Sequence, residues 1–170
     1  MKSDSDLSQH DQTNEIHPPI RSLLDALTFR LARLVAVNDL SGTTRLRNNF
    51  GLSLNEWRVL GLTHALGPVG FGRIRRLLLM DKGQLSRTAK ALTERGLLTT
   101  QPSPDDARAV ELVLTKEGEA LHDEVLSFTA ARNEVVVATL TPEECREFLR
   151  LLQKITAHNE ELSALAEALT

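Results

Sequence analysis

The chain has 170 residues, of which 41% are hydrophobic and 25% charged, so it is long enough for one domain with a good core. No apolar stretch reaches the roughly 20 residues that a membrane helix needs. The polar N-terminus lacks the apolar region of a secretory signal, so we expect a cytoplasmic protein. The single cysteine, Cys145, excludes an internal disulfide.

The net charge of −3 argues by itself against a DNA-binding protein, but the charges are unevenly distributed. Residues 21–70 and 71–115 each carry a net charge of +3. Residues 1–20 carry −3, and residues 116–170 carry −6. The middle of the chain is therefore basic and both ends are acidic, which suits nucleic-acid binding unless it is chance variation of the surface.

The first half of the chain predicts a mobile tail followed by helices. Residues 1–16 are polar and contain little to bury, and residues 20–40 carry apolar positions at helical spacing. Ser41-Gly42 predicts a break, followed by a short helix to about Asn49. The capping residue Ser53 precedes a third helix to about Leu66. A fourth helix is expected over 71–79.

The second half predicts one more short helix, a hairpin and two long helices. Asp81 is placed to cap a fifth helix to Arg95, and Gly96 to end it. Residues 97–101 are compatible with a strand, and residues 109–114 alternate with one apolar face, on either side of a charged turn. Helices are expected over 116–138 and from Thr141 onward. The apolar stripes of the end helices favour a two-chain bundle, unless these helices pack on their own chain.

The fifth helix has two chemically distinct faces. Its apolar face holds Leu85, Ala89 and Leu92. Its polar face holds Ser86, Arg87 and Lys90, with Gly83 near the start. A major groove accepts one helix, and its base edges and phosphates accept hydrogen bonds from such side chains, although a basic face is often only solvated.

The predicted hairpin carries Arg108 near its tip. An arginine on such a wing can enter a minor groove, where the electrostatic potential is negative. Asp106 is placed to orient Arg108 by a charge-assisted hydrogen bond. The alternative is an exposed ion pair at a turn, which would contribute little.

Three stretches resemble the MarR family of regulators. Residues 81–98 resemble its recognition helix with Ser86-Arg87 and a Leu-x-x-x-Gly-Leu exit. Asp106-Ala107-Arg108 matches the Asp-x-Arg wing, and 114–118 match Leu-Thr-x-x-Gly. Residues 57–60 are similar to the family's third helix. The resemblance covers about 20–165.

The resemblance implies a mainly α fold with a small β-hairpin wing. It implies a homodimeric repressor on a palindromic operator, with a winged helix-turn-helix domain at 42–115 and a helical dimerisation region at 17–41 and 116–170. Arg73 and Arg75 lie in a stretch more basic than the family pattern, which suggests added phosphate contacts. The predicted DNA contacts are Arg73, Arg75, Lys82, Gln84, Ser86, Arg87, Lys90 and Arg108.

The resemblance also implies release from DNA by a small aromatic or phenolic acid. A carboxylate needs a cation or a hydrogen-bond donor in an apolar cleft. The candidate ligand residues are His17, Arg45, Arg47, Phe50 and Trp57. Core packing is the alternative for Trp57, and a solvated or phosphate-facing position for either arginine.

Two other classes of function are less well supported. A thiol redox sensor would use Cys145, near a helix N-terminus that favours a thiolate, but Glu143, Glu144 and Glu147 oppose one. An enzyme is not expected, because no histidine has metal-ligand spacing with a cysteine or carboxylate and no phosphate loop is present. We therefore expect no metal or cofactor, and each histidine as a surface or capping residue.

Overall fold

The computed structural model describes residues 19–104, 106 and 109–168, the side chains of 165–168 excepted. Its contacts divide the chain into two units, residues 1–44 and 45–170. The boundary falls inside the helix α1 (Leu27–Phe50). The two units are described separately below.

The first unit begins with a short 3-10 helix, η1 (Leu23–Asp25). The Asp25 carboxylate accepts hydrogen bonds from the backbone N–H of Arg21 and Ser22 and from the Ser22 hydroxyl. The Ser22 hydroxyl and these backbone donors lower the pKa of Asp25. The chain then enters α1.

The predicted break at Ser41-Gly42 is wrong, because α1 continues through it to Phe50. The Ser41 hydroxyl donates to the Asn38 carbonyl, 3.3 Å away, so its polar group is satisfied inside the helix. Gly42 is buried. A glycine inside a helix costs only about 1 kcal/mol relative to alanine, and no proline follows to stop the helix. The short second helix predicted to Asn49 is thus the last part of α1.

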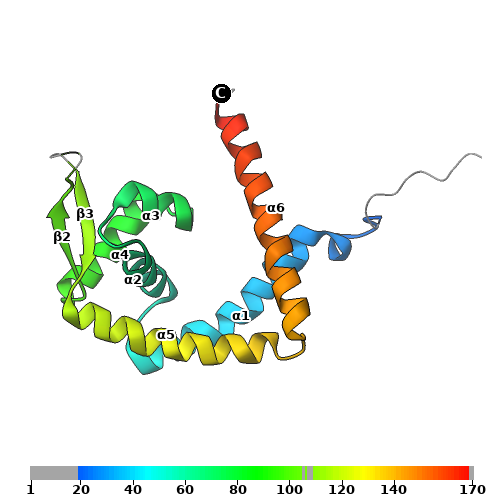
Figure 1. The fold of residues 1–170 in the computed structure, drawn as a ribbon, viewed down its shortest axis with the longest axis horizontal. Coiled ribbons are helices and arrows are strands. Elements are labelled where there is room, and N and C mark those ends of the chain that lie inside the picture. The colour runs from blue at the N-terminus through cyan, green and yellow to red at the C-terminus, as the bar shows by residue number, and fades with distance from the viewer. Residues whose placement is uncertain (1–18, 105, 107–108, 169–170) are drawn as a thin grey trace, which may run out of the picture. The chain divides into compact units, whose positions relative to one another are not determined.

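Three helices form the body of the second unit: α2 (Leu54–Leu66), α3 (Phe71–Leu78) and α4 (Lys82–Glu94) (Figure 1). Their predicted starts are confirmed. The Ser53 hydroxyl accepts from the Glu56 N–H and the Glu56 carboxylate accepts from the Ser53 N–H, which completes the capping box. Asp81 caps α4 through the Gln84 N–H, 2.7 Å away. Gly96 follows α4 with a φ of 71°, as a helix-ending glycine does.

The hairpin is also confirmed, with one strand more than predicted. β2 (Leu98–Pro102) and β3 (Val110–Leu114) pair antiparallel, with Leu98 opposite Leu114. β1 (Val69–Gly70) pairs with the other edge of β3, so the order is β1-β3-β2. A strand of two residues has no alternation to detect in the sequence.

Two long helices follow the sheet: α5 (Lys116–Val137) and α6 (Pro142–Ala168). Thr115 caps α5 through the Gly118 N–H. Thr141 and Glu144 form the predicted capping box of α6. No described helix is long and apolar enough to cross a membrane.

The core of the second unit lies where α2, α4, β3 and α5 meet. The buried apolar side chains include Leu52, Leu60, Ile74, Leu85, Leu92, Leu98, Leu112 and Val125. Burial of these side chains holds α4 against α2 and so decides which face of α4 remains outside.

Candidate nucleic-acid interface

The two faces of α4 are confirmed by burial. Leu85, Ala89 and Leu92 are 1%, 3% and 0% exposed. Ser86, Arg87 and Lys90 are exposed on the opposite side, and Gln84 is half-buried. The helix therefore holds its polar side chains outside while its apolar side chains anchor it to the core.

Arg87 lies over the first turn of α4. A Cβ placed on Gly83 would be 3.2 Å from Nη1 of Arg87, so the guanidinium reaches back along the helix to residue 83. Helical side chains lean toward the N-terminus, which explains this direction. The first turn of a recognition helix is the part that contacts base edges.

Lys90 has a partner on its own helix. Its Nζ lies 3.6 Å from Oε1 of Glu94 one turn later, with both side chains more than half exposed. Such a pair contributes little to stability. Lys90 can therefore exchange Glu94 for a phosphate at small cost.

The basic residues of α3 lie beside those of α4. Arg73 and Arg75 are exposed, while Ile74 between them is buried and anchors the helix. A hollow between the two helices brings several predicted contacts to one surface. It is lined by Phe71, Gly72, Arg75, Lys82, Leu85 and Ser86.

The tip of the wing is described only in part. Asp106 is exposed, and its backbone carbonyl accepts from the Ala109 N–H at 2.9 Å. The Ser103 N–H donates to the Ala109 carbonyl at the same distance, which closes the base of the turn. Arg108 lies outside the described residues. Its predicted pairing with Asp106 stays a prediction.

The segment that carries these helices is similar in sequence to a known protein family. Residues 50–109 match the sequence model of the MarR family, and this segment includes α2, α3, α4 and β2. Over this segment, the chain matches the MarR family. The relatives described below are named as transcriptional regulators, not as enzymes.

Two relatives illustrate the similarity. The uncharacterised HTH-type regulator YkoM of Bacillus subtilis is 29% identical over 112 residues, or 66% of this chain and 73% of YkoM. The HTH-type regulator Hpr of Exiguobacterium sibiricum is 34% identical over 96 residues, or 56% of this chain and 51% of Hpr.

Solved structures share the fold. A MarR/EmrR family regulator from Acinetobacter sp. ADP1 has a TM-score of 0.75 at 22% identity, covering 82% of this chain and 99% of that one. PcaV from Streptomyces coelicolor, solved with its natural ligand, has a TM-score of 0.66 at 22% identity, covering 82% of this chain and 98% of PcaV. At this identity, these likenesses concern the fold.

The predicted ligand residues lie in different surroundings. His17 is outside the described residues. Arg45 and Arg47 are exposed near the end of α1. Phe50 packs edge-on against Phe128 of α5, with ring centroids 5.5 Å apart. Trp57 is half-buried against the core, which fits the packing role considered for it.

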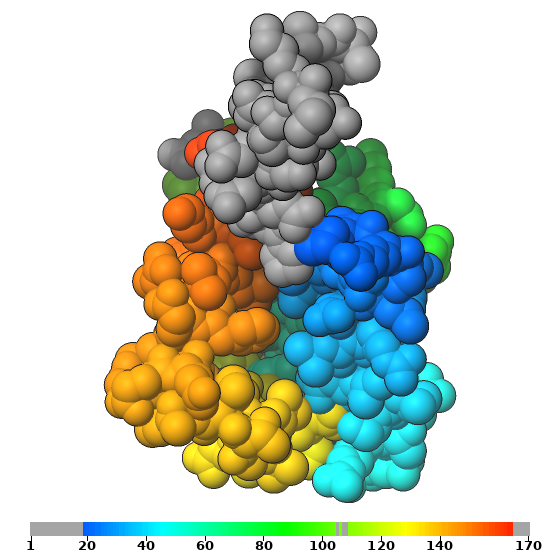
Figure 2. Space-filling view, turned by 90° about the vertical axis from the view of Figure 1, so that its right-hand side faces the viewer, coloured from blue at the N-terminus to red at the C-terminus, as the bar shows by residue number. Residues whose placement is uncertain are grey.

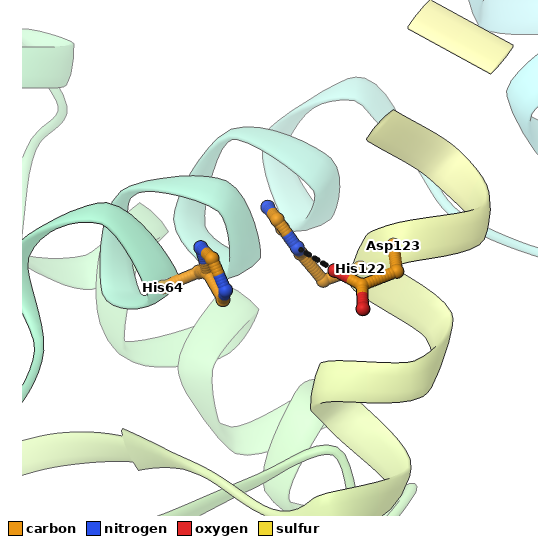
Figure 3. Close-up of side chains that lie close together, drawn as sticks. All are labelled: His64, His122 and Asp123. Carbon is orange, nitrogen blue, oxygen red and sulfur yellow. Dashed lines mark hydrogen bonds and ion pairs between the residues drawn. The ribbon is translucent and has the colours of Figure 1, made fainter. Parts of the chain in front are cut away.

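A cluster that the sequence did not predict joins α2 and α5. His122 is not a surface residue as expected, since it is 4% exposed. Its ring stacks on that of the exposed His64, with centroids 3.7 Å apart and planes inclined by 15° (Figure 3). Its Nδ1 lies 3.0 Å from Oδ1 of Asp123. His64 and His122 are distant in sequence, so no spacing pattern could reveal the pair.

Cys145 lies in the first turn of α6, as expected, and is half-buried. Its N–H donates to the Thr141 carbonyl at 2.9 Å. The neighbouring Glu143 pairs with Arg146, and Glu144 completes the helix cap. Of the residues around Cys145, Glu144 thus caps the helix and Glu143 forms a surface ion pair.

Proposed function

We propose that the chain is a dimeric, sequence-specific DNA-binding repressor, with α4 in the major groove and the wing in the adjacent minor groove. The observation that carries this proposal is the exposed polar face of α4, held opposite three buried apolar side chains. Arg87 would donate to a guanine, Ser86 and Gln84 would contact neighbouring base edges, and Lys90 a phosphate.

The arginines of α3 extend this surface. Arg75 lines a hollow with Lys82 and Ser86 of α4, and Arg73 is exposed on the same helix as Arg75. In this proposal, both arginines bind phosphates together with Lys82. Residues 71–115 keep a net charge of +3 in a chain whose total is −3. Local charge decides which surface faces the DNA. In this proposal, residues 42–115 form the DNA-binding domain.

A dimer is supported by apolar side chains that the chain leaves exposed near its C-terminal end. Val135 is 76% exposed and Leu149 is 57% exposed. The end of α5 and much of α6 lie at the surface in Figure 2, in yellow and orange. Residues of α1 such as Leu40 are also exposed. A second copy would remove these side chains from water and would match a palindromic operator.

For the effector, we propose a small aromatic or phenolic acid. PcaV, which shares this fold, was solved in complex with its natural ligand, so a protein of this fold can bind a ligand. In this chain, Arg45 and Arg47 offer cations near the end of α1, and Phe50 and Trp57 offer aromatic surface. A carboxylate effector would use such a cation, and its ring would use the apolar surface. His17 would close the site from the partner subunit.

The test compares matched variants on DNA from the chain's own promoter region. Arg87→Ala should weaken binding by about 1–3 kcal/mol and relax the base preference, because a bidentate contact is lost. Lys154→Ala removes one positive charge from the exposed surface of α6 and should leave binding nearly unchanged. Equal losses in both variants, or an unchanged base preference in Arg87→Ala, would refute α4 as the reading helix.

The effector is tested by release of bound DNA. Aromatic acids, phenols and their thioesters are added to the complex, with a peroxide control. Release by an aromatic acid, abolished when both Arg45 and Arg47 are changed to alanine, is the expected result. Release by peroxide alone, abolished in Cys145→Ser, would favour the thiol alternative instead.

A further inference from the structure

We propose that His64, His122 and Asp123 bind a divalent transition-metal ion, such as Zn²⁺, between α2 and α5. One ligand atom from each residue lies within 4.8 Å of the others. Two imidazoles and a carboxylate suit Zn²⁺ and its neighbours among the transition metals. None of the three ligands is among the residues proposed for DNA or effector binding, although Trp57 packs beside His122.

The pair formed by His122 and Asp123 already has the spacing of two ligands of one ion. Nδ1 of His122 and Oδ1 of Asp123 are 3.0 Å apart. With metal–ligand bonds of about 2.0–2.2 Å, neighbouring ligand atoms are separated by roughly 3–3.5 Å. An ion that binds both atoms lies off the line between them, so both side chains would reorient slightly, and a neutral His122 would carry its ring proton on Nε2.

Burial holds one ligand in place and leaves the others open to an entering ion. The His122 ring is enclosed between α5 and α2, with its side chain 5% exposed and the Trp57 ring centroid 5.6 Å away. The Asp123 side chain is 74% exposed, and His64 is exposed as well. A fixed imidazole lowers the entropy lost on binding, and two accessible ligands provide a path for the ion.

His64 must turn before it can bind. A metal ion lies in the plane of an imidazole that ligates it, and two stacked rings cannot aim their nitrogens at one point. Figure 3 shows the two rings face to face. Because His64 is exposed, its side-chain torsions can change without disturbing the core. Water would complete the coordination.

The ion would connect α2 and α5, which pack against each other at this point. His64 comes from the last turn of α2, while His122 and Asp123 come from the second turn of α5. The bound ion would therefore raise the stability of the second unit, because it binds the folded arrangement and not the unfolded chain.

The experiment uses the full chain, stripped with a chelator and dialysed. Co²⁺ is titrated while its visible absorption is followed, and Zn²⁺ affinity is measured by competition with a chromophoric chelator. We expect saturable binding, weakened at least tenfold in His64→Ala and in Asp123→Asn. His158→Ala, which removes an exposed histidine from α6, should bind like the wild type.

A second readout guards against adventitious binding at the chain's other histidines. Zn²⁺ should raise the melting temperature of the wild type and of His158→Ala, but not that of His64→Ala. His64→Ala is preferred to a change at His122, because the exposed residue can be removed without opening the core. An affinity that is the same in the wild type and His64→Ala, or no saturable binding, would overturn the proposal. Neither readout involves DNA, so it stands apart from the proposed function.

Discussion

Gly118 lies directly against the carbonyl group of Leu97. A Cβ on residue 118 would overlap the Leu97 carbonyl oxygen and would lie 3.0 Å from its carbon. The same carbonyl accepts a hydrogen bond from the Thr115 N–H, and the Thr115 hydroxyl donates to the Gly96 carbonyl at 2.6 Å. Thr115 and Gly118 of the Leu-Thr-x-x-Gly motif therefore hold the start of α5 against the residues that precede β2.

Gly118→Ala should lower the free energy of unfolding by about 3 kcal/mol, since the obstacle is backbone and cannot rotate away. Urea denaturation at one fixed protein concentration measures this free energy of unfolding. Gly72→Ala is the matched control, because its Cβ would meet only the end of the Arg76 side chain, 3.8 Å away. That variant should be as stable as the wild type or more so. Equal stability of both variants would show that a side chain is tolerated at position 118 beside the Leu97 carbonyl.

Glu56 should make the fold sensitive to acid. Burial raises the pKa of this carboxyl, but hydrogen bonds from Ser53 and the nearby Arg95 guanidinium outweigh burial and lower it below 4.5. A lowered pKa in the folded state stabilises the fold above the unfolded value, and this contribution is lost as the pH falls through the folded pKa. Stability should therefore decline as the pH drops below about 4.5.

The variant that tests this is Glu56→Gln, which should be less stable than the wild type at neutral pH and should lose less stability on acidification. Arg95→Ala keeps the carboxylate but removes one cause of the shift, so its pH dependence should be intermediate. Thermal unfolding from about pH 7 to about pH 3 measures both. A wild-type pH dependence in Glu56→Gln would assign the acid response to other carboxyls.

Arg108→Ala should weaken operator binding about tenfold, or roughly 1.4 kcal/mol, while the protein stays dimeric. The reason is the loss of a cation from a narrow minor groove. Fluorescence anisotropy measures affinity, and size-exclusion chromatography checks the dimer. Replacing A·T pairs by G·C where the wing contacts DNA should reproduce much of this loss in the wild type. Full affinity of Arg108→Ala at moderate salt would argue against an inserted wing.

Operator affinity should fall steeply as salt rises, because neutralised phosphates release counterions. Arg73→Ala should make the slope of log K against log salt shallower by about 1, with a similar loss on all sequences. A double change of Arg73 and Arg75 should make it shallower by about 2. A slope unchanged in either variant would remove α3 from the phosphate contacts.

Local signals in the sequence predicted most elements correctly. Ser53, Asp81, Thr115 and Thr141 cap helices because a side-chain oxygen reaches an N–H only three residues away, so cap and helix start are read together. The same locality explains the failure at Ser41-Gly42. Whether a helix breaks at these two residues depends on how the turns before and after them pack in the fold. The identity of the two residues does not reveal that packing.

The sequence alone determined most of the helices, the β2–β3 hairpin, the buried side of α4 and the family motifs, because periodicity, caps and turns act within a few residues of the chain. The tertiary structure decided what distant segments do to one another. It stacked His64 on His122, added β1 to the sheet edge and brought Gly118 against Leu97. Each of these brings together residues that are far apart in the sequence, and no pattern along the chain records such a contact.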